Sequence, residues 1–255
     1  MKIIKKLFAV VVVLAVLATA YPLFKDDIVS WYGCLDTELL IRKYAKENGL
    51  QYSDYPESLV ELLDRNPETK DFVLGYPHRE QKEYDMSEWA EIDSVPLFLQ
   101  WDVRWGYEIY GSDMIAITGC GPTCLAMVGY HLTRDSYFTP EKVAQFALEN
   151  GYYVDGNGSS WTLISEGAEE LGLTVEELPL GKQYMMNALN KGSPIILAMG
   201  PGDFTTTGHY IVLAGVKDGM FIVNDPNSKA RSERLWSHEE IQNQIRNIWE
   251  ISYHS

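Results

Sequence analysis

Positive charge is scarce in this 255-residue chain. It has 21 lysines and arginines against 36 aspartates and glutamates, which gives a formal net charge of −15 at pH 7. Domains that bind nucleic acid neutralise phosphates with a basic face, so we expect no nucleic-acid partner. The same charge argues against electrostatic docking on anionic lipids. We expect membrane contact only through the N-terminal segment, if that segment is retained.

Cysteine is also scarce, with Cys34, Cys120 and Cys124 as the three examples. Three cysteines do not form a disulfide framework, and an odd number leaves at least one thiol outside any intramolecular pair. Cys120 and Cys124 lie four residues apart on one predicted helix, a poor geometry for bridging each other. Together with His131 they lack a second ligand pair at a spacing that suits zinc. We therefore expect no metal and no cofactor, and Cys124 is interpreted as a core residue.

The chain lacks internal repeats and low-complexity tracts, and its first 20 residues differ from the rest. Three lysines among the first six residues precede an apolar run from Leu7 to Leu17, and Ala18-Thr19-Ala20 follows as a small-x-small pattern. This predicts a signal peptide at 1–20. The alternative is an uncleaved N-terminal membrane anchor, because apolar character continues to Phe24. We expect an exported protein, either secreted or anchored on the outer face of the cytoplasmic membrane.

Downstream, the pattern predicts a small helical N-terminal segment at 21–77, a polar linker at 78–94 and a main domain at 95–255. Within the main domain helical patterns come first and strand patterns later, which indicates an α+β fold rather than an alternating α/β fold. We expect helices at 120–131, 141–150, 161–171 and 183–191, and strands at 194–199, 209–216, 220–224 and 248–252.

The most informative stretch of the main domain surrounds Cys120. This cysteine lies between Gly119 and Gly121, and Pro122 suits the first turn of a helix. A thiol at a helix N-terminus is close to the positive end of the helix dipole, which favours the nucleophilic thiolate. The competing interpretation is a buried structural cysteine at a tight turn.

A second informative stretch is a predicted hairpin with His209 at the start of its first strand. If Lys217–Gly219 forms a three-residue loop, Asp225 lies diagonal to His209 on the same face. If the loop is only Asp218-Gly219, the register moves by one residue and Asn224 takes that position. The sequence leaves both registers open.

A cysteine nucleophile needs a base, and the base needs an orienting group on its other nitrogen. Cys120, His209 and Asp225 or Asn224 would supply these three groups. Gln100 is a candidate for the oxyanion hole, in which its side-chain amide and the Cys120 backbone N–H would bind the developing negative charge. The competing interpretation of Gln100 is a surface glutamine.

Four motifs carry a resemblance to a known family. They are Gln100-Trp101-Asp102-x-Arg104-Trp105, Gly119-Cys120-Gly121-Pro122-Thr123, Gly208-His209-x-Ile211-Val212-Leu213 and Asn224-Asp225-Pro226. In this order they resemble the papain-like cysteine peptidases of the double-glycine, bacteriocin-processing type. The resemblance is strongest to the stand-alone exported branch of Gram-positive bacteria.

This resemblance implies a papain-like α+β fold, with the Cys-bearing helix packed on an antiparallel sheet that bears His and Asp. It implies Cys120 as nucleophile, His209 as base, Asp225 as orienting residue and Gln100 as the oxyanion-hole amide. One departure concerns Gln100, which precedes Cys120 by twenty positions. In transporter-linked members the glutamine precedes the cysteine by about one helical turn.

The sequence therefore predicts an exported cysteine peptidase that hydrolyses peptide bonds through a Cys-His-Asp triad and an acyl-enzyme. Its expected partner is a peptide or protein substrate, a cell-wall peptide included, and the expected state is a monomer. One alternative is a cell-wall peptide amidase or acyltransferase with the same triad. Another is a non-catalytic surface module that binds peptides.

Overall fold

The computed structural model describes residues 36–80 and 83–254, so the predicted signal peptide or anchor at 1–20 lies outside the described residues. The chain divides into two compact units, and the second begins at Glu68. The boundaries predicted at 77/78 and 94/95 stay predictions. Among the described residues, no helix has the length and apolar character needed to cross a bilayer.

The first unit is helical in its described part. Residues 36–47 form a helix, a 3-10 turn covers Tyr52–Asp54, and α2 spans Glu57–Arg65. α2 buries four apolar residues at spacings of one, three and four: Leu59, Val60, Leu62 and Leu63. Thr37 Oγ1 donates a hydrogen bond of 3.1 Å to Asp64 Oδ1, which joins the two helices.

The second unit includes the residues directly after Pro67. α3 spans Lys70–Gly75, and the ring of Phe72 stacks on that of Tyr107 with 4.2 Å between centroids. Further along, Trp89 is buried in the main core, 4.9 Å from the Phe98 ring. Aromatic pairs of this kind add about 0.5–1.5 kcal/mol to the stabilisation that burial gives. Residues upstream of position 95 therefore contribute to the core of the second unit.

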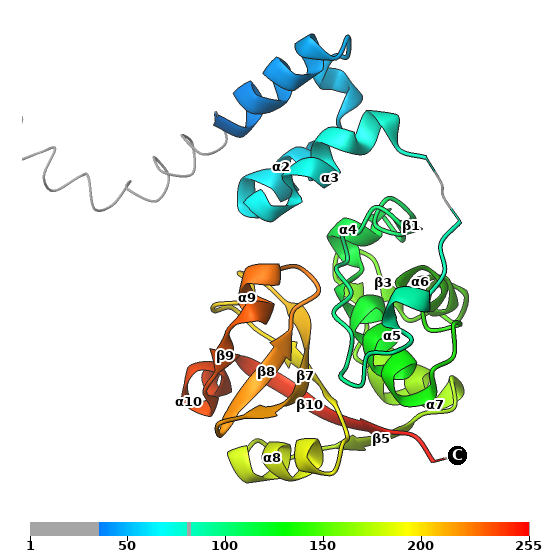
Figure 1. Ribbon diagram of the computed structural model, residues 1–255, viewed down its shortest axis with the longest axis vertical. Coiled ribbons are helices and arrows are strands. Elements are labelled where there is room, and N and C mark those ends of the chain that lie inside the picture. Colours follow the sequence, from blue (N-terminus) through cyan, green and yellow to red (C-terminus); the bar gives the residue numbers. More distant parts are fainter. Residues whose placement is uncertain (1–35, 81–82, 255) are drawn as a thin grey trace, which may run out of the picture. The chain divides into compact units, whose positions relative to one another are not determined.

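A six-stranded antiparallel sheet forms the centre of the second unit (Figure 1). In spatial order the strands are β5 (Thr174–Glu177), β10 (Ile245–Ser252), β6 (Ile195–Met199), β7 (His209–Lys217), β8 (Met220–Asn224) and β9 (Leu235–Trp236). The expected final strand at 248–252 thus starts three residues earlier, at Ile245.

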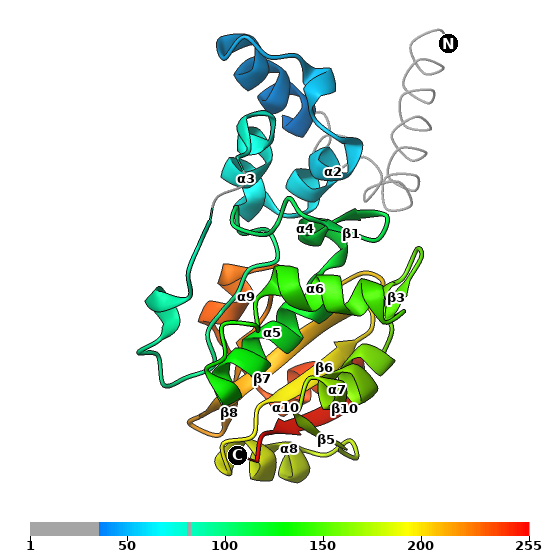
Figure 2. The same cartoon turned by 90° about the vertical axis from the view of Figure 1, so that its right-hand side faces the viewer.

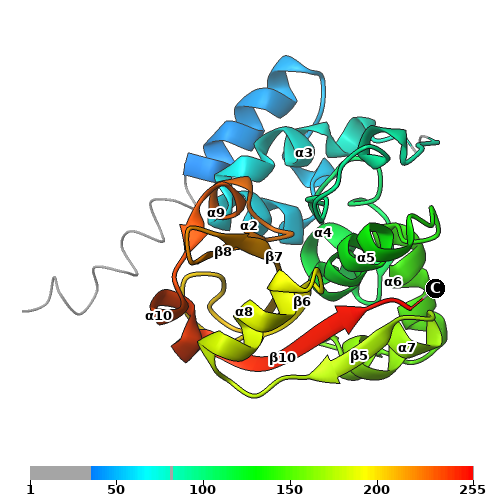
Figure 3. The same ribbon diagram turned by 60° about the horizontal axis from the view of Figure 1, so that its bottom comes forward.

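Helices cover both faces of this sheet. α5 (Cys120–Thr133) and α6 (Pro140–Glu149) lie on one face, and α8 (Lys182–Asn190) lies on the other (Figures 2 and 3). In β6, Ile196 and Ala198 belong to the core cluster that contains α5, whereas Leu197 and its odd-numbered neighbours belong to the cluster that contains α8. A strand that is buried on both faces has a continuous run of apolar residues in its sequence. Ile195–Met199 has this pattern.

Shorter elements complete the unit: β1 (Ile109–Tyr110), β2 (Asp113–Met114), α4 (Ile115–Thr118), β3 (Tyr153–Val154), β4 (Gly158–Ser159), a π-helical turn (Leu163–Gly167), α7 (Ala168–Glu170), α9 (Lys229–Glu233) and α10 (His238–Ile241). The helix expected at 161–171 is therefore partly π-helical. The predicted α+β class is confirmed, because the Cys-bearing α5 packs against the antiparallel sheet that carries His209.

Candidate active site

Cys120 is the first residue of α5, and Gly119 is its N-cap. The Thr123 side chain donates to the Gly119 carbonyl at 2.7 Å and fixes this turn. A Cβ atom at position 121 would lie 2.6 Å from Ser159 Oγ in β4, so only glycine allows this close approach. The flanking glycine thus lets α5 begin against β4, with the Cys120 side chain partly buried at the helix N-terminus.

His209 and Asp225 meet at the end of the β7–β8 hairpin. His209 Nε2 lies 2.8 Å from Asp225 Oδ1, and the two side chains are 8% and 0% exposed. Cys120 lies close enough to His209 for the histidine to lower the pKa of its thiol. Because Asp225 occupies Nε2, the other ring nitrogen, Nδ1, remains for Cys120. The structure therefore brings three predicted residues into one connected arrangement.

Asp225 reaches His209 through a strand register that contains features of both alternatives left open by the sequence, the two-residue loop and the three-residue loop. Lys217 pairs with Met220, so the loop has two residues, Asp218 and Gly219. Both have positive φ, at 54° and 74°, as a type I′ turn requires. Between Leu213 and Gly215 the pairing shifts by one residue. This β-bulge restores the register of the three-residue alternative at the far end of the hairpin.

Asn224, the alternative orienting residue, points elsewhere. Val212 lies opposite Asn224 in the ladder. The Asn224 side chain donates to the carbonyls of Val95 and Pro96 at 3.0 and 3.1 Å. Asn224 therefore fixes the backbone at Val95 and Pro96, a few residues before Gln100.

The three triad residues shift one another's pKa values. Burial alone would raise the pKa of Cys120, but the hydrogen bond and the charge of His209, with backbone hydrogen bonds from Tyr210 and Gly121, bring it below its ordinary value. Burial would lower the pKa of His209, yet the Asp225 carboxylate and Cys120 raise it to about 10. Between these two pKa values the stable form is a thiolate beside an imidazolium.

Asp225 has a second cationic partner that the sequence did not predict. Arg231 Nε donates to Asp225 Oδ2 at 2.5 Å, and the Asn227 backbone N–H donates to Oδ1 at 2.8 Å. Burial would raise the pKa of Asp225, but His209 and Arg231 hold it below its ordinary value. α9, which carries Arg231, has only five residues, too few to give a periodic signal in the sequence.

Gln100 is buried, at 3% exposure, and is not a surface residue. Its side-chain Nε2 donates to the Ala116 carbonyl at 2.7 Å, and Oε1 is buried without a hydrogen-bond partner among the described residues. Its backbone N–H donates to the Pro226 carbonyl at 2.7 Å, which ties it to the loop after Asp225. Gln100 thus lies between the Asp225 loop and α4, the turn that directly precedes Cys120.

The second cysteine of α5 lies away from this chemistry. Cys124 is fully buried in the core, and burial raises the pKa of its thiol well above the ordinary value. In the part of the chain that the structure describes, no three His, Cys, Asp or Glu side chains are grouped as a metal site would need.

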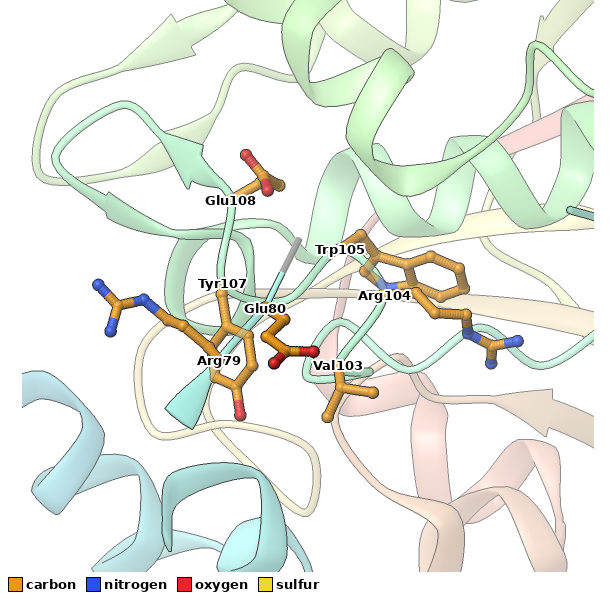
Figure 4. Close-up of a pocket in the computed structure, with 7 residues that line it drawn as sticks. All are labelled: Arg79, Glu80, Val103, Arg104, Trp105, Tyr107 and Glu108. Atoms are coloured by element: carbon orange, nitrogen blue, oxygen red, sulfur yellow. The ribbon is translucent and has the colours of Figure 1, made fainter. Parts of the chain in front are cut away.

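Two hollows lie apart from the triad. One, of about 330 Å³, is lined by Arg79, Glu80, Val103, Arg104, Trp105, Tyr107 and Glu108 (Figure 4). The other, of about 620 Å³, lies between the 88–104 segment and α9, and Lys229 and Ser232 belong to its lining. Neither is lined by Cys120, His209 or Asp225.

The chain is similar to a curated protein, to two solved structures and to a family model. A curated relative is the probable microcin-H47 secretion/processing ATP-binding protein MchF of Escherichia coli, 28% identical over 142 residues. The match covers 56% of this chain but only 18% of that protein.

Two solved structures are similar. The peptidase domain of Streptococcus ComA, described as a bi-functional ABC transporter involved in quorum sensing, has 19% identity and a TM-score of 0.46. The alignment covers 63% of this chain and 99% of that one. A putative C39-like peptidase from Bacillus anthracis has 15% identity and a TM-score of 0.43, with coverage of 64% and 97%.

The model of the Peptidase_C39 like family matches residues 92–255, which is more than half of the chain. The matched region contains Cys120, His209, Asp225 and Gln100. This chain therefore belongs to the Peptidase_C39 like family and is a cysteine peptidase, a hydrolase.

Proposed function

We propose that the protein hydrolyses peptide bonds with Cys120 as nucleophile, His209 as general base and acid, and Asp225 as the residue that orients the imidazole. The observation that carries this proposal is the position of His209, which lies 2.8 Å from Asp225 and close enough to Cys120 to lower the pKa of its thiol. A peptide-binding module would not need a connected cysteine, histidine and carboxylate.

In the proposed reaction, the Cys120 thiolate attacks the carbonyl carbon of the scissile amide and forms a tetrahedral intermediate. The His209 imidazolium gives its proton to the leaving amine, and the C–N bond breaks to leave a thioester on Cys120. His209, now neutral, takes a proton from water, and the resulting hydroxide attacks the thioester. The carboxylic acid product leaves, and the thiolate–imidazolium pair is restored.

Alkylation of Cys120 tests the ion pair without a known substrate. At pH 7 we expect Cys120 to react with iodoacetamide much faster than Cys34 and Cys124. In His209→Ala the burial that raises the pKa of Cys120 would be opposed only by the backbone hydrogen bonds from Tyr210 and Gly121. The pKa of the thiol would then rise and the thiolate fraction at pH 7 would fall, so the rate should drop roughly tenfold or more. Mass spectrometry of tryptic peptides gives each cysteine its own rate.

His78→Ala, which changes an exposed histidine, is the matched control and should leave the rate unchanged. If Cys120 reacted as an ordinary thiol both with and without His209, the triad would not operate, and the peptide-binding module would be the better interpretation. If Cys120 is activated but its acyl-enzyme transfers to an amine in preference to water, the protein is an acyltransferase. Product masses from a peptide screen separate hydrolysis from transfer.

For Gln100 we propose that the Nε2 hydrogen not given to Ala116 contributes to the oxyanion hole, together with the Cys120 backbone N–H. Gln100→Ala should lower kcat roughly 10²- to 10³-fold, because one oxyanion donor contributes a factor of that size in other hydrolases. It should leave the alkylation rate of Cys120 close to that of the wild type. A kcat within threefold of wild type would reject this role.

Export is part of the same proposal. It is supported by the basic start, the apolar run and the Ala18-Thr19-Ala20 pattern of residues 1–20. Fractionation of expressing cells, with the intact mass of the recovered chain, separates a cleaved secreted form from an anchored one. Recovery of the full-length chain from the cytosol alone would reject export.

A further inference from the structure

The carboxylate of Asp225 has two ends, and only one of them faces the histidine. Oδ1 accepts from His209 at 2.8 Å, while Oδ2 accepts from Arg231 Nε at 2.5 Å. The carboxylate is fully buried, whereas the Arg231 side chain is 28% exposed. A short buried carboxylate with one free end could rotate about its Cβ–Cγ bond. Arg231 holds the Oδ2 end, and the Asn227 N–H helps to hold the Oδ1 end that faces His209.

Arg231 in turn depends on α9, a helix of five residues. Helices this short are unstable without tertiary support. Two contacts hold α9 to the Asp225 segment: the Ser228 N–H donates to the Asp225 carbonyl at 3.2 Å, and Ser232 Oγ accepts from the Asp225 N–H at 2.9 Å. The Ser228 side chain also accepts from the Arg231 N–H at 3.1 Å, as an N-cap does.

A third support for α9 comes from far away in the sequence. The carboxylate of Glu68 accepts from Ser228 Oγ at 2.5 Å and from the Lys229 N–H at 2.8 Å. It thus binds the free backbone donor at the start of α9, where a negative charge is favourable. Glu68 lies upstream of residues 92–255, the part of the chain that the family model covers.

We propose that Arg231 and Glu68 are positioning residues of the peptidase: Glu68 fixes the start of α9, and α9 presents Arg231 to the outer oxygen of Asp225. The residues before the peptidase domain would then be part of the catalytic apparatus. This inference rests on the proposed triad, and its test uses variants that leave Cys120, His209 and Asp225 in place.

The test measures kcat/KM as a function of pH for a peptide that the wild type cleaves. In Arg231→Gln we expect kcat to fall roughly tenfold, because the Asp225 carboxylate loses a charged hydrogen-bond donor. The alkaline limb, which reports His209 with its pKa of about 10, should move upward, since one positive charge near the imidazolium is gone. Arg231→Lys should restore the limb but not the full kcat, because lysine keeps the charge and loses the planar donor geometry.

For Glu68→Gln we expect a kcat roughly two- to fivefold lower, with Asp71→Asn as the matched control of equal charge change in α3. Thermal melting accompanies every variant, and if Arg231→Gln does not fold, Arg231→Lys and Glu68→Gln decide the question. If the folded variants keep the wild-type kcat and the wild-type alkaline limb of the pH profile, the inference is wrong. The proposed triad would not be affected by that result. If the wild type cleaves no peptide and Cys120 is unreactive, the proposed function fails, and this inference fails with it.

Discussion

Replacement of Cys120 by serine is expected to abolish peptide hydrolysis, with a loss of at least about 10⁴-fold in kcat. Serine has the same shape and would keep the N-terminus of α5 packed on β4. A hydroxyl, however, is far less acidic than a thiol, so the His209 imidazolium would no longer face an anion. The effect is chemical and should appear with little change in melting temperature. The measurement is turnover of a cleaved peptide followed by mass spectrometry.

The control for this variant is on the same helix. Cys124 is one turn further along and fully buried, with a raised pKa. Cys124→Ala should keep most of the activity and lose a little stability, because it removes one buried sulfur atom from the core. Retention of wild-type turnover in Cys120→Ser would assign the hydrolysis to another group or to a contaminant.

The second large effect is expected for Asp225→Asn, with a loss on the order of 10³- to 10⁴-fold in kcat, as for the corresponding change in a serine-protease triad. The carboxylate accepts at both ends, from His209 and the Asn227 N–H at Oδ1 and from Arg231 at Oδ2. An asparagine has only one acceptor oxygen. Whichever way its amide is turned, its NH₂ group faces a donor, either Arg231 or the His209 side.

This variant should also change how stability depends on pH. The lowered pKa of Asp225 contributes stability that is present above the ordinary carboxyl pKa and is lost as pH falls through the folded-state value. The raised pKa of His209 contributes stability that is present below the ordinary histidine pKa and is lost as pH rises through about 10. Asp225→Asn removes the first contribution and the part of the second that comes from the carboxylate, while the part that comes from Cys120 stays.

Urea unfolding at several pH values should therefore give a flatter stability profile for Asp225→Asn, with about 1–3 kcal/mol less stability near pH 7. Asp218→Asn is the matched control, because it makes the same chemical change in the turn of the same hairpin. Asparagine accepts the positive φ of 54° at that position. If both variants had equal activity, Asp225 would not be the orienting residue.

The positions of Cys120 and His209 in the fold could be predicted because their signals are local. A cysteine between glycines before a proline indicates the N-terminus of a helix, and a histidine before an apolar run indicates the start of a strand. The fold class followed from the order of these patterns along the chain. The papain-like assignment needed the family resemblance as well, because an α+β order is shared by many folds.

Three features of the site could not be predicted from the sequence. The burial of Gln100 depends on contacts with Ala116 and Pro226, which tertiary packing alone determines. Arg231 lies in a helix too short for a periodic pattern. Glu68 reaches its partner Ser228 across 160 positions of the chain, and an exposed-looking glutamate near a proline carries no sign of such a contact.

The bulge between Leu213 and Gly215 has a consequence for how related chains are aligned. A hairpin with one more residue in its turn and one fewer in its first strand would present the same carboxylate to the histidine. Insertions and deletions at these two places compensate each other, so neither gap alone shows which acidic or amide side chain reaches the imidazole. The turn and the first strand can therefore each change by one residue in opposite directions, at constant hairpin length, while the same residue orients the imidazole.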